Sequence, residues 1–192
     1  MIGEACCQAT LWPDQRRIAV NISVAQLTTA CWRENVEQAL AESGLAPSRL
    51  ELEVTESVFM GDDAAALAAL TSLHALGVRL VLDDFGKGYS SFGYLSRACF
   101  AKIKIDQLFV RGAANGQRES LAIVNSILAL AKGLGVETTA EGIETAAQTQ
   151  LMAHLGCTQL RGCLFGRPVS ADAVRMTPRQ QNERGCPPRR RA

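Results

Sequence analysis

The 192-residue sequence lacks the features that mark membrane, secreted and zinc-binding proteins. No apolar run approaches the roughly 20 residues that a membrane-spanning helix needs, and no signal peptide follows Met1. We therefore expect no membrane association and a cytoplasmic location. The seven cysteines are an odd number without CxxC spacing, which argues against both a zinc site and a disulfide framework.

Charge is nearly balanced, with a net charge of +1, but it is unevenly distributed. Residues 175–192 hold six Arg against one Glu, so this segment carries +5 and residues 1–174 carry −4. The segment is rich in Pro, Gln and Arg without apolar periodicity, which predicts a disordered tail. No aromatic residue lies between its arginines, so a solvated tail is favoured over contact with a nucleic acid polymer. Residues 1–174 are expected to form one folded domain.

Strand and helix patterns alternate along these 174 residues. The expected strands, each followed by a helical or loop segment, are 17–23, 50–57, 80–84, 101–106, 136–140 and 159–165. Consecutive strand–helix units without doubled strands predict a parallel α/β sheet. A doubly wound sheet remains possible, but no glycine-rich phosphate fingerprint follows the first strand. Polar residues end nearly every strand, which favours a barrel whose side chains converge at one mouth.

Two adjacent carboxylates, Asp83 and Asp84, follow the apolar run of the third strand. They repel one another unless a cation or a proton lies between them, so a divalent metal is one explanation. Capping of the next helix by one Asp, with the other solvated, explains the pair about equally well. Asn21 and Glu53 end two further strands. The four side chains offer oxygen ligands that suit Mg²⁺ or Mn²⁺ and not zinc.

A lysine and a further glutamate end the next two strands. Lys104 could stabilise a phosphate oxygen, and Glu141 could orient or deprotonate a water molecule. Metal, lysine and carboxylate base together predict phosphoester hydrolysis. Each residue could equally be a strand-end cap or half of an ion pair, although that explanation is weaker for five strand ends together. The Asp-Phe-Gly triplet at Asp84–Gly86 is not a kinase signature, because no HRD loop or phosphate-covering glycine loop accompanies it.

Seven short motifs occur in order along the chain and together resemble the EAL domain family. They are 20–23 (VNIS), 51–57 (ELEVTES), 83–86 (DDFG), 88–91 (GYSS), 104–106 (KID), 140–145 (AEGIET) and 156–157 (GC). The family comprises bacterial cyclic di-GMP phosphodiesterases. The resemblance, from about Gly3 to Val169, implies a TIM-like barrel and Mg²⁺- or Mn²⁺-dependent opening of cyclic di-GMP to linear pGpG. It also implies a possible homodimer.

The resemblance assigns roles by motif position. Metal ligands correspond to Asn21, Glu53 and Asp83, and the carboxylate serving a second metal ion corresponds to Asp84. Lys104 corresponds to the lysine at the catalytic water, and Glu141 to a glutamate that acts as base or metal ligand. Glu56 corresponds to the glutamate that steadies the loop after Asp84.

Several departures from the family pattern leave alternatives open. The Glu-Ala-Leu motif and two early strands are absent, so residues 1–174 are expected to be an N-terminally truncated EAL domain with about six of eight strands. Lys87 replaces a Thr, Arg161 a Gln, Cys99 a Pro and Ala101 an Asp. Lys87 and Arg161 could bind phosphate. The chain could be an active phosphodiesterase, an inactive EAL module that binds nucleotide or dimerises without turnover, or a fragment without independent function.

Overall fold

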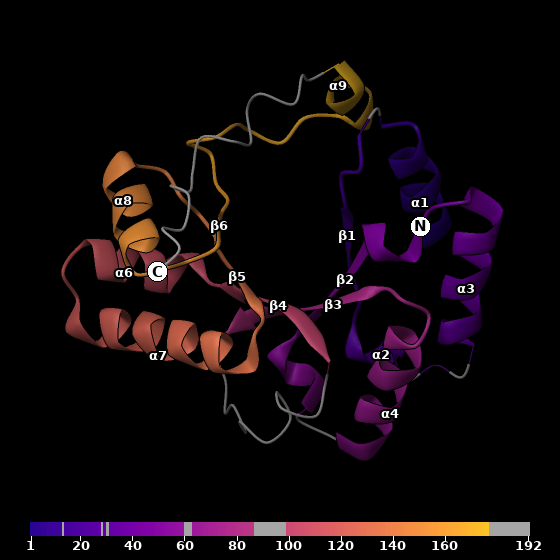
Figure 1. The fold of residues 1–192 in the computed structure, drawn as a ribbon, viewed down its shortest axis with the longest axis horizontal. Coiled ribbons are helices and arrows are strands. Elements are labelled where there is room, and N and C mark those ends of the chain that lie inside the picture. Colours follow the sequence, from indigo (N-terminus) through magenta and orange to yellow (C-terminus); the bar gives the residue numbers. More distant parts are fainter. Residues whose placement is uncertain (13, 28, 30, 60–62, 87–98, 177–192) are drawn as a thin grey trace, which may run out of the picture. The chain divides into compact units, whose positions relative to one another are not determined.

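The computed structural model describes residues 1–12, 14–27, 29, 31–59, 63–86 and 99–176. It divides into two compact units, Met1–Ala101 and Lys102–Ala192, which are taken in turn. Each unit is built from parallel strands and the helices that follow them (Figure 1). None of the helices in the described ranges is long and apolar enough to cross a membrane.

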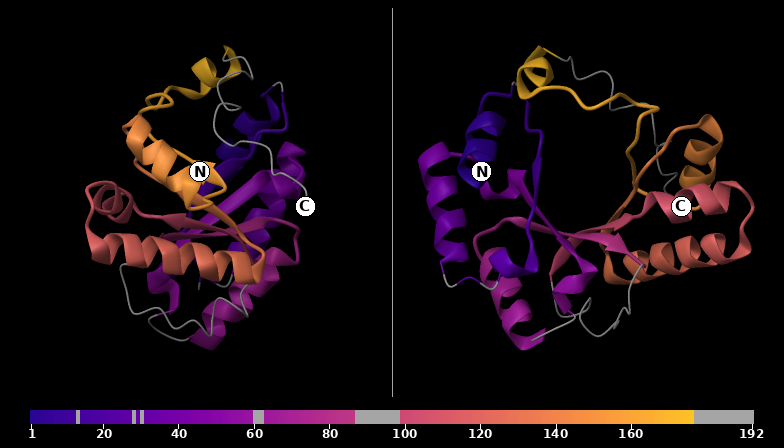
Figure 2. Two further views of the ribbon diagram at one scale, coloured as in Figure 1. Left: turned by 60° about the vertical axis from the view of Figure 1, so that its left-hand side comes forward. Right: turned by 180° about the vertical axis from the view of Figure 1, so that it is seen from behind.

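The first unit contains three parallel strands, β1 (Ile18–Asn21), β2 (Leu50–Thr55) and β3 (Arg79–Phe85). Adjacent positions along β1 and β2 pair from Ile18–Leu50 to Asn21–Glu53, and β2 and β3 pair from Glu51–Arg79 to Thr55–Asp83. Its further elements are α1 (Ile2–Thr10), α2 (Val24–Leu27), α3 (Trp32–Ser43), η1 (Pro47–Arg49), η2 (Glu56–Phe59), α4 (Asp63–His74) and the start of β4 (Phe100–Ile105). Figures 1 and 2 show α1 and α3 packed side by side.

The core of the first unit lies on one face of its strands. Period-two alternation sends the buried aliphatic side chains of Leu50, Leu52, Val54, Leu80 and Leu82 to the same face. The other face carries Glu51, Glu53 and Asp83, so the sheet is divided into an aliphatic side and a polar side. Glu51 and Glu53 are nonetheless buried. Aliphatic and acidic side chains therefore alternate along β2, but buried and exposed positions do not.

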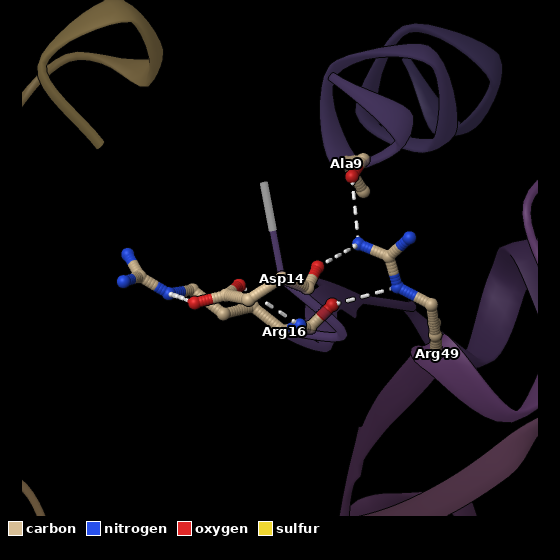
Figure 3. A network of polar contacts seen from close by, with 4 residues as sticks. All are labelled: Ala9, Asp14, Arg16 and Arg49. Atoms are coloured by element: carbon tan, nitrogen blue, oxygen red, sulfur yellow. Dashed lines mark hydrogen bonds and ion pairs between the residues drawn. The ribbon is translucent and has the colours of Figure 1, made fainter. Parts of the chain in front are cut away.

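One arginine fastens α1 to the start of β2. Arg49 donates from Nη2 to the carbonyl oxygens of Ala9 (2.7 Å) and Asp14 (3.2 Å), and from Nε to that of Arg16 (3.0 Å) (Figure 3). Asp14 in turn accepts from Arg16 Nε at 2.7 Å. Hydrogen bonds from a charged donor are stronger than neutral ones, so this fork holds the chain entering β1.

The second unit continues β4 and adds β5 (Glu137–Ala140) and the two-residue β6 (Gln159–Leu160), all parallel. Its helices are α6 (Gln107–Ala114), α7 (Arg118–Leu134), α8 (Ala146–His154) and α9 (Ala171–Met176). α6 and α7 lie side by side in both figures. Thr158 completes the strand edge by accepting from Thr138 N at 2.7 Å and donating to Thr138 O at 2.7 Å.

Most expected elements are present, but several boundaries were wrong. β2 ends at Thr55, and Glu56 begins η2. β3 continues through both aspartates to Phe85. Asp106 is not the end of β4 but the N-cap of α6, where its Oδ1 accepts from Leu108 N at 2.8 Å. β6 is two residues long instead of seven, and α9 includes the first two residues assigned to the tail. Residues 177–192 lie outside the described ranges.

Candidate active site

Three of the four candidate metal ligands lie on the polar face of the first unit. Asn21 on β1 pairs in register with Glu53 on β2, and Glu53 pairs with Val81 on β3. Asp83 lies two residues beyond Val81 and therefore on the same face, one step nearer the carboxyl end of the strand. Asn21 is exposed, Asp83 is half-buried and Glu53 is buried. The register thus gathers one amide and two carboxylates at the carboxyl ends of adjacent strands.

Asp84 has an unusual backbone conformation. Its φ of 55° makes it the single non-glycine residue with positive φ in the described ranges, and Gly86 follows with a φ of 100°. Asp tolerates the left-handed region better than most residues, and its backbone N–H donates to Asp83 Oδ1 at 2.9 Å. Such conformations cost free energy and concentrate at functional sites. The left-handed backbone at Asp84 interrupts the alternation of side chains between the two faces of β3, and it does so at the two adjacent carboxylates.

The remaining residues expected near these carboxylates are Glu56 and Lys87. Glu56 is half-buried and is the first residue of η2, directly after β2. Lys87 lies outside the described residues. Within the described ranges, no group of three or more His, Cys, Asp or Glu side chains is arranged to hold a metal ion. The first unit therefore supplies suitable oxygen donors by register, without a closed cluster of carboxylates.

The second unit brings three candidate residues into direct contact. Lys104 Nζ lies 3.0 Å from Glu141 Oε1, and Arg161 Nη1 lies 3.6 Å from the same oxygen. The lysine side chain is 7% exposed and the arginine side chain 67% exposed, with Glu141 between them at 23%. One carboxylate oxygen thus faces a buried cation on one side and a solvated cation on the other.

Backbone contacts fix the loop that carries Glu141. Glu141 N donates to Ile105 O at 3.0 Å, and Ile143 N donates to Arg161 O at 3.0 Å. A side chain at Gly162 would collide with the backbone of Ile143, so only glycine allows this close approach. The loop leads into the expected capping box of α8, in which Thr145 Oγ1 accepts from Gln148 N and Gln148 Oε1 accepts from Thr145 N. These contacts hold Glu141 beside Lys104.

Sequence reasoning missed one polar arrangement in each unit. Buried Glu51 receives Arg79 Nε at 3.2 Å and lies 3.7 Å from Arg17 Nη1. Thr139 pairs in register with both Lys104 and Gln159, and its hydroxyl donates to Gln159 Oε1 at 3.2 Å. The sequence shows polar residues at every second position in 51–53 and in 137–139, but this pattern does not distinguish a buried polar residue from an exposed one.

Comparison with known proteins identifies this arrangement of strands and polar ends. The family model described as the EAL domain matches residues 1–168. The chain belongs to the EAL domain family. It is 43% identical over 178 residues to the bifunctional diguanylate cyclase/cyclic di-GMP phosphodiesterase MucR of Pseudomonas aeruginosa, covering 91% of this chain and 26% of MucR. The chain spans about a quarter or less of the length of the first curated relatives that it matches, from 21% to 26%.

Solved structures support the EAL fold. The PaMucR phosphodiesterase in complex with c-di-GMP has a TM-score of 0.85 and 43% identity, covering 90% of this chain and 71% of that chain. Klebsiella pneumoniae BlrP1 with manganese and cyclic di-GMP has a TM-score of 0.78 and 29% identity, covering 86% and 43%. The expected fold class, an incomplete TIM-like α/β barrel of the EAL type with six parallel strands in the described ranges, is confirmed.

The candidate ligands of this EAL domain fit a divalent cation by their chemistry. Asn21, Glu53, Asp83 and Asp84 all offer oxygen, with no Cys or His among them. Oxygen-only sets suit Mg²⁺ and Mn²⁺. Adjacent carboxylates at Asp83 and Asp84 also gain from a positive charge between or beside them.

Proposed function

We propose that this EAL domain is a divalent-metal-dependent phosphodiesterase that opens cyclic di-GMP to linear pGpG. One observation carries the proposal: successive strands of a chain that matches the family over residues 1–168 each have a polar residue at or near the carboxyl end. These residues are Asn21, Glu53, Asp83, Lys104 and Glu141. MucR is named for cyclic di-GMP phosphodiesterase activity, and two neighbouring structures are complexes with cyclic di-GMP. A nucleotide second messenger is made and degraded inside the cell, so we also propose a cytoplasmic location.

The first group of residues is proposed to hold Mg²⁺ or Mn²⁺. Asn21, Glu53 and Asp83 would hold one ion, and Asp84 would serve a second. When bound, the ions supply Lewis-acid polarisation of the phosphoryl group and neutralise developing charge. Glu56, placed at the start of η2, is proposed to steady the segment after Asp84.

The second group is proposed to handle the proton and the developing charge. In the reaction, a water oxygen bonds to phosphorus, the bond from phosphorus to the ribose 3′ oxygen breaks, and that oxygen keeps the bonding electrons and takes up a proton from solvent. Glu141 would accept the proton of the attacking water, and Lys104, fixed 3.0 Å from it, would offset negative charge on the phosphoryl oxygens. Arg161, which is largely exposed, and Lys87 are proposed to bind the substrate phosphates.

Domain limits and assembly follow as further parts of the proposal. We assign residues 1–174 to the EAL domain without its first two strands, and residues 175–192, with a net charge of +5, to a tail that is disordered beyond the end of α9 at Met176. A homodimer through EAL domains is proposed from the family resemblance. Limited proteolysis and the mass in solution test these two parts.

The activity is tested by separating binding from turnover. Calorimetric titration of the purified chain with cyclic di-GMP in Ca²⁺ should show binding, because calcium occupies carboxylate sites without supporting turnover. Chromatography after exchange into Mg²⁺ or Mn²⁺ should then show pGpG. A folded protein that binds cyclic di-GMP in Ca²⁺ but forms no pGpG in either metal would contradict the proposal.

A further inference from the structure

The first unit contains a pocket at the amino-terminal ends of its strands, opposite the ends that carry Asn21 and Glu53. Its volume is about 450 Å³, within the range of small-molecule sites. Most of the lining comes from the segments that enter β1, β2 and β3, and the lining residues are Gln15, Arg17, Ser48, Arg49, His74, Gly77, Val78, Arg79 and, from β4, Ala101. The same three strands therefore present one set of polar residues at each end.

The lining of this pocket is basic. Arg17, Arg49 and Arg79 contribute three guanidinium groups and His74 an imidazole, while no Asp or Glu lines it among the described residues. Arg49 donates hydrogen bonds to the neutral carbonyl oxygens of Ala9, Asp14 and Arg16 (Figure 3). These carbonyl oxygens fix the position of the guanidinium group but do not neutralise its positive charge.

A buried carboxylate behind the pocket orients the other two arginines. Glu51 lies 3.2 Å from Arg79 Nε and 3.7 Å from Arg17 Nη1, and it is itself 5% exposed. This carboxylate of β2 lies between two guanidinium groups, one just before β1 and one at the start of β3, and fixes both. Fixed arginines lose less conformational entropy on binding an anion than free ones do.

We propose that this pocket binds a small phosphate-bearing anion, of the size of pyrophosphate to a nucleoside diphosphate. Guanidinium groups match the geometry of phosphate oxygens and donate to them in pairs. Ser48, exposed beside Arg49, and Gln15 add neutral donors at the same rim. The site is distinct from the candidate active site, and it does not depend on the chain being a phosphodiesterase.

Pyrophosphate is the probe, titrated calorimetrically at low salt in EDTA so that no divalent ion bridges it to the carboxylates at the other strand ends. We expect one site whose affinity falls steeply with added NaCl. Arg17→Gln should weaken binding at least about fivefold because it removes a charge from the lining, and His74→Ala about twofold because it removes a hydrogen-bond donor. The matched control is Arg33→Gln, an exposed arginine of α3 outside this pocket, which should change affinity by less than about 1.5-fold.

Ser48→Glu gives an independent test, because it places a negative charge at an exposed position of the rim without disturbing the Glu51 contacts. It should abolish pyrophosphate binding while the protein keeps its circular dichroism spectrum. Absence of pyrophosphate binding to the unaltered chain would overturn the proposal. Equal effects of Arg17→Gln and Arg33→Gln, or equally tight binding of citrate, would overturn it too, since the pocket would then not be selective for phosphate.

Discussion

The two units of this EAL domain assemble polar residues in opposite ways. In the second unit, Glu141 is already neutralised by Lys104 at 3.0 Å and Arg161 at 3.6 Å. In the first unit, the candidate residues are carboxylates and an amide, and two of the carboxylates are neighbours in sequence with a strained turn at Asp84. The second unit places two cations within 4 Å of its candidate carboxylate, whereas the candidate residues of the first unit are themselves all oxygen donors.

Because of this difference, we expect the candidate residues of the second unit to keep their arrangement without a ligand and those of the first unit to need a bound cation. A paired lysine and glutamate keep their geometry without a ligand, as expected of residues that move a proton or stabilise a charge at a fixed place. A set of oxygen donors of one sign is completed by a cation, as expected of metal ligands. Substitutions in each group should therefore change different measurements.

The largest effect is expected from Glu141→Gln. Loss of the carboxylate removes the proposed proton acceptor, and we expect the turnover number with cyclic di-GMP to fall about 10²- to 10⁴-fold. Glu144→Gln is the matched control in the same loop, because Glu144 is exposed and pairs with Arg111 at 2.7 Å. Near-normal turnover by Glu141→Gln would show that Glu141 is not the proton acceptor, whatever the result for Glu144→Gln.

Metal affinity should distinguish the first group from the second. Asp83→Asn removes one anionic ligand, and we expect Mn²⁺ to bind about 10- to 100-fold more weakly in a titration without substrate. Glu37→Gln, an exposed carboxylate of α3, serves as control and should leave the affinity unchanged. If Glu141→Gln weakened Mn²⁺ binding as much as Asp83→Asn does, the division of roles between the units would be wrong.

Stability without metal should depend more on Glu141 than on Asp83. Glu141→Gln removes the charge 3.0 Å from the buried Lys104 ammonium, which should lower the free energy of unfolding by about 1 to 3 kcal/mol. Asp83→Asn removes one of two neighbouring carboxylates and keeps an oxygen for Asp84 N, so it should lower that energy by less. Urea unfolding in EDTA measures both, and an equal or larger loss for Asp83→Asn would contradict the comparison.

Much of the fold follows from local sequence patterns. Gly44, with a φ of 68°, ends α3 where expected, and Thr145 with Gln148 forms the expected capping box. Both signals act within one helical turn, so neighbouring residues suffice to predict them. The α6 helix was missed because Asp106 suits a polar strand end as well as an N-cap, and only the contact with Leu108 N distinguishes them.

The candidate site could be predicted as a set of residues but not as a set of contacts. Polar strand ends and family motifs named Lys104 and Glu141, and a departure from the family pattern named Arg161. The contacts among the three depend on the close approach of Gly162 to the Ile143 backbone, far along the chain. The buried Glu51 was missed for a similar reason. Alternation in β2 suggests an exposed acid, and only the partner strands bring Arg17 and Arg79 to it.

The smallest effect is expected at Arg161, and it tests whether the two cations on Glu141 are equivalent. The Arg161 side chain is 67% exposed and 3.6 Å from the carboxylate, a kind of ion pair that contributes about 0 to 1 kcal/mol to stability. Arg161→Gln should therefore leave stability and turnover number nearly unchanged and raise KM for cyclic di-GMP about two- to fivefold by removing a phosphate contact. Arg161→Lys, which keeps the charge, should recover part of that loss. A fall in turnover number with unchanged KM would instead mean that Arg161 acts by positioning Glu141, and the solvated cation would then belong to the same catalytic unit as Lys104.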